Sequence, residues 1–471
     1  MLIGSLDRAD ESDMARDPDP ARKRGSVAAN SAMAAMVALC AASFVALAAN
    51  AGAKVSSAAT AAPASRTKVY WVALTGSDKN SGATRDQALR TVAEAWQRIP
   101  QGVTLNAKVV IKVTKGTYKR TDTPNYWEQR YGAPNATITI VSVDGPLAAT
   151  FRGDMNVFDV RHLIVDGVRI SAGGDAFHCE RCADVTLRHV ELDGGKRLAH
   201  DLLKVNQTNN FVLEDSDVHG ADDNALDFVA VRGGRVARNR IHDALDWCAY
   251  AKGGSSDIVV EGNEIFDCGT GGFTAGQGTG LEFMEAPNLT YEAERITVRA
   301  NSIHDTDGAG LGVNGGLRIT ISGNRLERVG RRSHLVEFGF GNRSCDGDVI
   351  RCRQRLAAGA WGTSALGDGE NFVRIPNREV SFTDNTIENP PGYESQWQQF
   401  FVAGEYAGAE QGASAKNPNP ARADDGLVIR GNTIRNGNGD KPLGVGDDQG
   451  CRSANPTCNA AQLVRDNRIN R

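Results

Sequence analysis

The sequence predicts an all-β fold, a right-handed parallel β-helix closed at its N-terminal end by a short helix. A phrase ending in Asn-x-aliphatic recurs along the chain, and its aliphatic positions Ile170, Leu192, Val218, Ile241 and Ile265 are 22 to 26 residues apart. A repeat of this length corresponds to one turn, or rung, of a solenoid. The strands between the phrases are β-branched, and no intervening segment is long enough for a crossover helix, which disfavours a leucine-rich horseshoe.

The asparagine of each phrase is predicted to face the interior. It stands two residues before the aliphatic position, and side chains two apart on a strand point to the same side. We therefore expect a buried ladder in which each asparagine hydrogen-bonds the neighbouring rung. Its clear copies are Asn239, Asn263, Asn301, Asn324, Asn385, Asn432 and Asn467.

A short helix is predicted to begin at Thr91. Thr91 and Glu94 form the pattern of a capping box, in which each residue satisfies a backbone amide of the first helical turn. Val92, Ala95, Trp96 and Ile99 follow at helical spacing and form one apolar face. Such a helix suits the open N-terminal end of the solenoid, where apolar surface and strand edges would otherwise be exposed.

The N-terminal region predicts export. Arg22, Lys23 and Arg24 precede an Ala-rich apolar stretch, and Ala51-Gly52-Ala53 fits a signal-peptidase site. We expect a signal peptide at 1–53, a linker at 54–66 and the β-helix domain at 67–471, with loop insertions near 281–295, 338–378 and 390–424. The mature chain would then have no membrane span and would be secreted, periplasmic or on the cell surface. Retention as an anchor is the alternative, because about 18 apolar residues can just cross a bilayer.

Cysteine usage favours disulfides. Of the nine cysteines, Cys40 lies in the predicted signal, which leaves an even number in an exported chain. Two cysteine pairs are close enough in sequence to form disulfides within loops: Cys345 with Cys352, and Cys451 with Cys458. Cys179 and Cys182 lack a second ligand pair at the spacing of a zinc site, so we expect a local disulfide or a redox-inert pair. The net charge of -4 argues against a nucleic-acid partner, and we expect a monomer.

A polar column appears when the strands are aligned on the Gly-rich turns that follow them. It contains Arg232, Lys252, Gln277 and Asn314, with Glu337 next, and counting back by twos places Phe228, Tyr250 and Phe273 on the same outward face. Polar groups beside aromatic rings suit a sugar-binding groove, whereas a solvated face with loop-covered aromatics is the alternative. An insertion adds Arg332 and His334 on this side.

Acidic residues gather at the adjoining turns, at Asp222, Asp223, Asp227 and Asp246. Carboxylates one rung apart, roughly 4.8 Å, repel each other unless a cation compensates them. We expect these four residues to bind calcium, a hard cation that takes several oxygen ligands. The alternative is that the aspartates only form turns.

The region from Tyr70 to Gly82, followed by the helix at Thr91, resembles the opening of many bacterial pectate-lyase-like β-helix proteins. Lys115 to Tyr118 and Ile138 to Pro146 are similar to the first rungs of the same superfamily, and the resemblance covers nearly everything after residue 66. It implies the fold, while the superfamily includes lyases, hydrolases, epimerases and non-catalytic surface proteins. Family-nine pectate lyases are similar in plan, with acidic calcium ligands on neighbouring rungs and a lysine base, although their full Asp and Lys spacing is not reproduced here.

These patterns predict an exported polysaccharide-active protein, and a lyase that cleaves an anionic, uronic-acid-containing glycan by β-elimination is the favoured interpretation. Lys252 is the candidate base and Arg232 a catalytic partner that would favour its neutral form, while calcium would neutralise the substrate carboxylate. The candidate substrate-binding residues are Tyr250, Phe273, Gln277, Asn314, Arg332, His334 and Glu337. The alternatives are a glycoside hydrolase using Asp222, Asp223 and Asp246, and a non-catalytic glycan-binding or structural solenoid.

Overall fold

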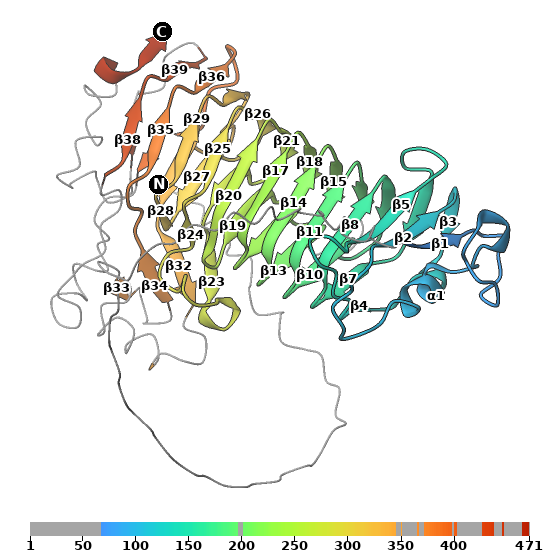
Figure 1. Cartoon of the computed structure of the whole chain (residues 1–471). Coiled ribbons are helices and arrows are strands. Elements are labelled where there is room, and N and C mark those ends of the chain that lie inside the picture. Colours follow the sequence, from blue (N-terminus) through green and yellow to red (C-terminus); the bar gives the residue numbers. More distant parts are fainter. Residues whose placement is uncertain are drawn as a thin grey trace, which may run out of the picture. The chain divides into compact units, whose positions relative to one another are not determined.

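The computed structural model describes residues 67–195, 201–344, 350, 365–366, 372–397, 400–402, 426–437, 445–446 and 464–470. These residues form a right-handed parallel β-helix built from three parallel sheets (Figure 1), so the predicted fold class is confirmed. The predicted signal peptide and linker lie outside the described residues, as do the pairs Cys345–Cys352 and Cys451–Cys458. In the described parts of the chain, no helix is long and apolar enough to cross a membrane.

Each rung contributes one strand to each sheet, in the order first, second, third. In spatial order, the first sheet contains β1 (Lys68–Val72), β2 (Val109–Val113), β5 (Ile138–Ser142), β8 (Arg161–Asp166), β11 (Ala183–Arg188), β14 (Asn209–Glu214), β17 (Arg232–Ala237), β20 (Ser255–Glu261), β25 (Thr297–Arg299), β29 (Thr320–Ser322), β35 (Ser381–Thr383) and β38 (Val428–Arg430). The second sheet contains β3 (Gly116–Tyr118), β6 (Ala149–Arg152), β9 (Val168–Ser171), β12 (Glu191–Asp193), β15 (Asp217–Ala221), β18 (Arg240–Ala244), β21 (Glu264–Cys268), β26 (Ser302–Thr306), β30 (Arg325–Glu327), β36 (Thr386–Asn389), β39 (Thr433–Asn436) and β41 (Arg468–Asn470).

The third sheet carries the candidate site. It contains β4 (Trp127–Glu128), β7 (Met155–Phe158), β10 (Phe177–Glu180), β13 (Leu203–Asn206), β16 (Leu226–Val229), β19 (Trp247–Lys252), β22 (Gly271–Ala275), β27 (Leu311–Asn314), β31 (Val336–Gly339), β37 (Phe400–Val402) and β40 (Val445–Gly446). A small fourth sheet joins β23 (Gly278–Gly280), β32 (Gly341–Ser344), β34 (Phe372–Ile375) and β33 (Ala365–Leu366), and β24 (Ala293–Glu294) and β28 (Gly316–Leu317) pair beside the first sheet. The short 3-10 helices are η2 (Arg85–Gln87), η3 (Arg120–Asp122) and η4 (Leu281–Phe283).

The asparagine ladder is confirmed. Asn263 is buried, and its Oδ1 atom accepts hydrogen bonds from the backbone N–H and the Nδ2 of Asn239, both at 3.0 Å. Its own Nδ2 donates to the carbonyl of Val236 at 2.9 Å and to Oδ1 of Asn301 at 2.9 Å. Each asparagine thus satisfies a turn amide of the preceding rung that the sheets leave unpaired.

The capping helix is also present as α1 (Val92–Gln97). Thr91 Oγ1 accepts from the N–H of Glu94 at 3.1 Å, which is one half of the predicted capping box. The other half is wrong, because Asp78 accepts the Thr91 N–H at 2.9 Å and Glu94 pairs with Arg98 instead. The apolar face is buried, and the ring of Trp96 lies 4.9 Å from that of Trp127 on the first rung of the third sheet.

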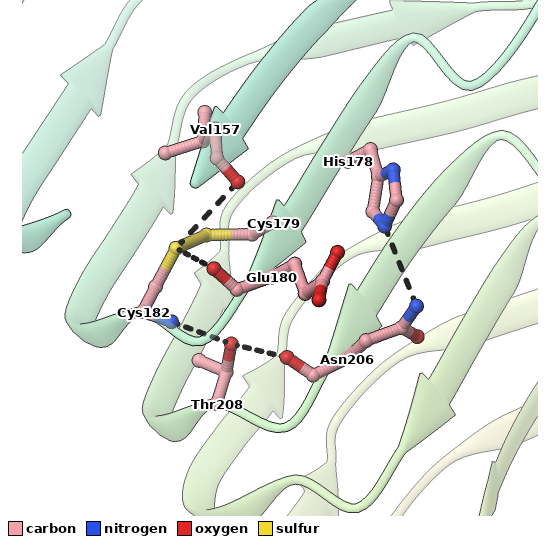
Figure 2. Close-up of a disulfide and its surroundings, with 7 residues drawn as sticks. All are labelled: Val157, His178, Cys179, Glu180, Cys182, Asn206 and Thr208. Atoms are coloured by element: carbon pink, nitrogen blue, oxygen red, sulfur yellow. Dashed lines mark hydrogen bonds between the residues drawn. A yellow bond between two sulfur atoms is a disulfide. The ribbon is translucent and has the colours of Figure 1, made fainter. Parts of the chain in front are cut away.

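Two disulfides lie in the described part of the chain. Cys179 and Cys182 are bonded at the end of β10, which confirms the local pair (Figure 2). Cys248 and Cys268 form the second bond, which joins β19 to the end of β21 on the next rung.

Candidate active site

The outer face of the third sheet presents one side chain per rung in a straight column. Register partners along it are His178, Lys204, Asp227, Tyr250, Thr274, Gly312 and Glu337. Lys252 stands two residues beyond Tyr250 on the same face of β19. The expected outward direction of Tyr250 and Lys252 therefore agrees with the structure, although Tyr250 is buried at 3% exposure and offers little surface to a substrate.

The expected outward direction of Phe228 and Phe273 is wrong. Both rings are packed in the hydrophobic core, at 2% exposure each. Counting by twos fails here because Arg232 and Gln277 lie beyond turns, where Ala230 has φ 55° and Gly276 has φ 89°. A residue in the left-handed conformation interrupts the alternation of side chains along a strand. Counting back by twos from Arg232 and Gln277 therefore assigns the phenylalanines to the outer face, although they face the core. Phe273 is thus a core residue that cannot contact a glycan on the outer face.

Lys204 is the central cation of the column. Its Nζ lies 2.8 Å from Oδ2 of Asp201 and 3.7 Å from Oδ2 of Asp227. Burial would raise the pKa of Asp201, but the charge and the hydrogen bond of Lys204 outweigh burial and hold that pKa below its usual value. Burial likewise opposes the charge on Lys204, yet the carboxylates of Asp201 and Asp227 keep its pKa raised.

The pKa of Asp227 is shifted in the opposite direction from that of Asp201. Burial first, and then the negative charge of Asp201, raise its pKa to about 7. Its Oδ1 atom is enclosed and has no hydrogen-bond partner among the described residues. A neutral carboxyl group loses less by such isolation than an ionised one, so Asp227 is suited to hold a proton near neutral pH.

Asp223 and Asp246 occupy the turns that lead into β16 and β19, one rung apart. The backbone N–H of Asp246 donates to the carbonyl of Asp223 at 3.1 Å, and both side chains are partly exposed. Burial and the charges of Asp201 and Asp246 raise the pKa of Asp223 to about 6. Burial, followed by the charge of Asp201, also raises the pKa of Asp246, whereas a hydrogen bond from Thr270 acts to lower it.

Asn224 ties these groups together. Its Nδ2 lies 2.8 Å from Oδ1 of Asp201, 3.0 Å from Oδ1 of Asp223 and 3.1 Å from the hydroxyl of Tyr250. Its Oδ1 accepts the N–H of Trp247 at 3.1 Å and so joins two rungs. Burial and the surrounding carboxylates raise the pKa of Tyr250 well above its usual value, so its phenol stays protonated.

Lys252 lies at the opposite edge of the column from the two turns. Its Nζ donates to Oε1 of Gln277 at 2.9 Å and lies 4.4 Å from the centre of the Tyr250 ring. The side chain is partly exposed, so a ligand can reach it. Gly253 and Gly254 follow it with φ of 65° and 84°, and a Cβ on Gly254 would lie 2.2 Å from the carbonyl of Asn288. Only glycine admits the inserted segment this close.

Arg232 and Lys252 lie on different sheets. It belongs to β17 of the first sheet and is the register partner of Ser256, whereas Lys252 belongs to the third sheet. Its guanidinium donates to the carbonyl of Ala286 at 2.8 Å and pairs with Glu285 at 3.3 Å. Arg232 therefore anchors the inserted segment after η4, and its predicted catalytic partnership with Lys252 lacks a geometric basis.

The four aspartates predicted to bind calcium do not converge on a common point. Among the described residues, no three His, Cys, Asp or Glu side chains are grouped to hold a metal ion. Lys204 already compensates Asp201, at 2.8 Å, and Asp227, at 3.7 Å. Asp222 is partly exposed on the same turn as Asp223. This donor set does not fit calcium.

The remaining predicted substrate residues lie further along the third sheet. Asn314 Nδ2 donates to Thr274 Oγ1 at 3.0 Å, and the hydroxyl of Ser333 contacts Glu337. The His334 ring packs 5.3 Å from that of Trp397. Arg332 is directed to Asp307 at 3.6 Å and is 77% exposed, so it stands apart from this group.

Sequence reasoning missed Asp201, Lys204, His178 and Asn224. Asp201 and Lys204 lie on rungs whose Asn-x-aliphatic phrase is degenerate, so the alignment did not reach them. Burial first, and then the charge of Lys204, lower the pKa of His178, whose Nε2 lies 3.4 Å from Nδ2 of Asn206 (Figure 2). A signal was available for Asp201 and Lys204, which precede Asn224 and Asp227 by 23 residues each, the length of one repeat.

The fold and this column define the chain as a right-handed parallel β-helix protein with a polar, charged outer sheet. The family model described as "Right handed beta helix region" matches residues 148–286. A glycoside hydrolase structure superposes with a TM-score of 0.50 and 8% identity, covering 78% of this chain and 96% of that chain.

Two further structures share the fold at lower similarity. The A-module of mannuronan C-5 epimerase AlgE4 from Azotobacter vinelandii gives a TM-score of 0.41 and 12% identity, covering 70% of this chain and 90% of that chain. The pectate lyase Pel9A gives 0.38 and 12%, covering 83% and 84%. No curated protein has a sequence significantly similar to this chain.

Proposed function

We propose that this protein is a polysaccharide-cleaving enzyme, specifically a glycoside hydrolase that uses Asp223 and Asp246. One observation carries the proposal: two partly exposed carboxyl groups with raised pKa values lie on consecutive turns beside the outer face of the third sheet. Glycosidases place such a pair on either side of the bond they cleave. The glycan-active proteins among the structures of the same fold agree with this class.

Asp223 suits the role of general acid. With a pKa of about 6 it holds a proton in mildly acidic solution and can donate it to the leaving glycosidic oxygen as the bond to the anomeric carbon breaks. Asp246 is the candidate partner, because a hydrogen bond from Thr270 partly offsets the rise that burial causes in its pKa. At the spacing of adjacent rungs, roughly 4.8 Å, the pair suits a retaining mechanism, in which Asp246 attacks the anomeric carbon as the glycosidic bond breaks and water later displaces it. Asp223 takes a proton from that water and so regains the proton that it gave to the leaving oxygen, which balances the cycle.

The charge of the site favours a neutral glycan. Among the described residues of the site, four carboxyl groups, Asp201, Asp223, Asp227 and Asp246, face two ammonium groups, Lys204 and Lys252. A substrate carboxylate would meet more negative than positive charge unless the aspartates are protonated. Sugar hydroxyls have no such penalty, and Lys252, Gln277 and the aspartates are suitable hydrogen-bond partners for them.

A lyase acting on an anionic glycan is the second candidate. The partly exposed Lys252 beside Tyr250 favours it, because a lysine base removes the proton α to a uronate carboxylate. No step through calcium follows from this site, since the donor set does not fit. This alternative requires an unsaturated product, which separates it cleanly from hydrolysis.

The deciding experiment is a screen of neutral and anionic polysaccharides, scored for new reducing ends and for ultraviolet absorbance of unsaturated uronate. We expect reducing ends without the chromophore, and activity that falls as pH rises through about 6, since the acid must be protonated. Asp223→Asn should lower kcat by about 10²- to 10⁴-fold. Asp257→Asn is the matched control, because Asp257 lies on β20 of the first sheet and pairs with Arg295.

Other outcomes reject the proposal in recognisable ways. A growing chromophore that is abolished by Lys252→Ala would establish the lyase. Binding without cleavage, unchanged in Asp223→Asn, would establish a non-catalytic solenoid. Export belongs to the same proposal, and the disulfide between Cys248 and Cys268 supports it, because such bonds persist in oxidising compartments. A monomeric state stays a prediction.

A further inference from the structure

The register column of the third sheet carries smaller residues beyond Tyr250. On the next two rungs, the places of Tyr250 in the register are taken by Thr274, which is fully buried, and by Gly312. A Cβ on Gly312 would lie 2.9 Å from Oγ1 of Thr274, so the Thr274 hydroxyl and the amide of Asn314 that bonds it close this position. The column therefore has no large side chain on these two rungs.

The following rung carries an aromatic pair. Trp397 packs on His334 with ring centroids 5.3 Å apart and planes tilted by 53°. The indole side chain remains 44% exposed, although the backbone is held: Trp397 N–H donates to Ser333 O at 3.3 Å, and Ser395 Oγ donates to Trp397 O at 3.0 Å. An exposed ring on a fixed backbone costs little entropy when it binds a ligand.

A polar group stands beside this pair. Glu337 occupies the register column on β31, one rung beyond Gly312, and the Ser333 hydroxyl orients it. Glu337 is partly exposed. A flat ring with an adjacent carboxylate matches a pyranose, whose C–H face packs on an aromatic ring while its edge hydroxyls donate hydrogen bonds.

We propose that Trp397, His334 and Glu337 form a distal sugar-binding subsite on the same face as the aspartate pair. Three rungs separate β19 from β31, which corresponds to roughly 14 Å along the helix axis. A glycan held at both places therefore spans several sugar units. The subsite makes the protein selective for chains long enough to reach from Asp223 and Asp246 to Trp397. This inference rests on the proposed glycan-cleaving function.

Chain-length dependence tests the subsite. Neutral cello-, xylo- and galacto-oligosaccharides from disaccharides to octasaccharides, with oligogalacturonates as the anionic comparison, would be assayed for cleavage, and for binding by calorimetry to Asp223→Asn. Trp397→Ala should raise KM and Kd for octasaccharides by about tenfold, the loss expected for one aromatic contact. Cleavage of disaccharides should be unchanged, and kcat should stay within a factor of about two, because Asp223 and Asp246 are intact.

Three controls keep the result specific. Trp397→Phe keeps an aromatic face and should retain most of the affinity for long chains. Trp71→Ala removes a tryptophan from β1 of the first sheet, where it lies against Lys112 and Arg85, and should behave as the parent. Melting temperature and near-ultraviolet circular dichroism confirm that each variant is folded.

The outcomes separate this inference from the proposed function. If the parent cleaves long chains and Trp397→Ala cleaves them with parental KM, the subsite is rejected and the hydrolase stands. An equal loss on short and long chains also rejects it, because the tryptophan would then be supporting the fold. A parent that neither binds nor cleaves any of these glycans overturns both proposals.

Discussion

The ammonium group of Lys204 lies 2.8 Å from the Oδ2 atom of Asp201, three residues earlier in the chain, and Asp201 is almost fully enclosed. Asp227 shares the same cation at 3.7 Å. Because enclosed charges are costly without a partner, this lysine determines which carboxyl groups of the site can ionise.

Lys204→Met should therefore destabilise the protein strongly at high pH. Removing the cation leaves Asp201 and Asp227 enclosed without compensation, and we expect a loss of about 2–4 kcal/mol at pH 8. At pH 5 protonation relieves part of the penalty, so the loss should be smaller. Urea denaturation at the two pH values measures the difference. Lys108→Met, at an exposed position, is the control, and an equal loss at both pH values would contradict the explanation.

The raised pKa of Asp227 makes stability depend on pH. Its folded-state value of about 7 exceeds the ordinary 3.8, so the folded state binds the extra proton between these values. Its contribution is fully present below about pH 4 and is lost as pH rises through about 7. Asp227→Asn should remove this dependence and raise stability at pH 8 by about 1–3 kcal/mol. Calorimetric melting between pH 4 and 8 tests this, and a steeper dependence in the variant would refute it.

Asn263→Leu tests the ladder. The substitution removes the acceptor for two Asn239 donors and leaves the carbonyl of Val236 without its bond. We expect a loss of about 1–3 kcal/mol in the free energy of unfolding. Asn209→Leu, on an exposed position of β14, should change it by less than about 0.5 kcal/mol. Equal effects of the two substitutions would mean that the ladder bonds contribute nothing.

Arg232→Ala tests the anchoring of the inserted segment. Loss of the contacts with Glu285 and Ala286 should increase amide exchange at residues 282–288 about tenfold, which corresponds to roughly 1.4 kcal/mol of local stability. Arg235→Ala is the matched control, because Arg235 pairs with Glu261 on the first sheet and does not contact this segment. Unchanged exchange in Arg232→Ala would show that other contacts hold the loop.

Local sequence patterns were enough to predict the backbone architecture of this fold. The Asn-x-aliphatic repeat predicted the rungs and the buried ladder, because the asparagine and the aliphatic residue have the same orientation on every strand. The Thr91 N-cap was predicted for the same reason, as capping depends on residues within one helical turn. Asp78, which takes the Thr91 N–H, comes from a loop 13 residues away and was beyond such reasoning.

By itself, the sequence determined the solenoid, its period, the direction of Tyr250 and Lys252, and the gathering of aspartates at adjoining turns. Only the tertiary structure decided what surrounds those aspartates. Turn residues with positive φ reset the strand alternation and sent Phe228 and Phe273 into the core, and Arg232 was directed to Glu285 rather than to Lys252. The rungs bring Asp201 and Lys204 against Asp227, and burial together with these charges sets which carboxyl keeps its proton. Such pKa values depend on the distances and enclosure of groups from separate rungs, which no local pattern contains.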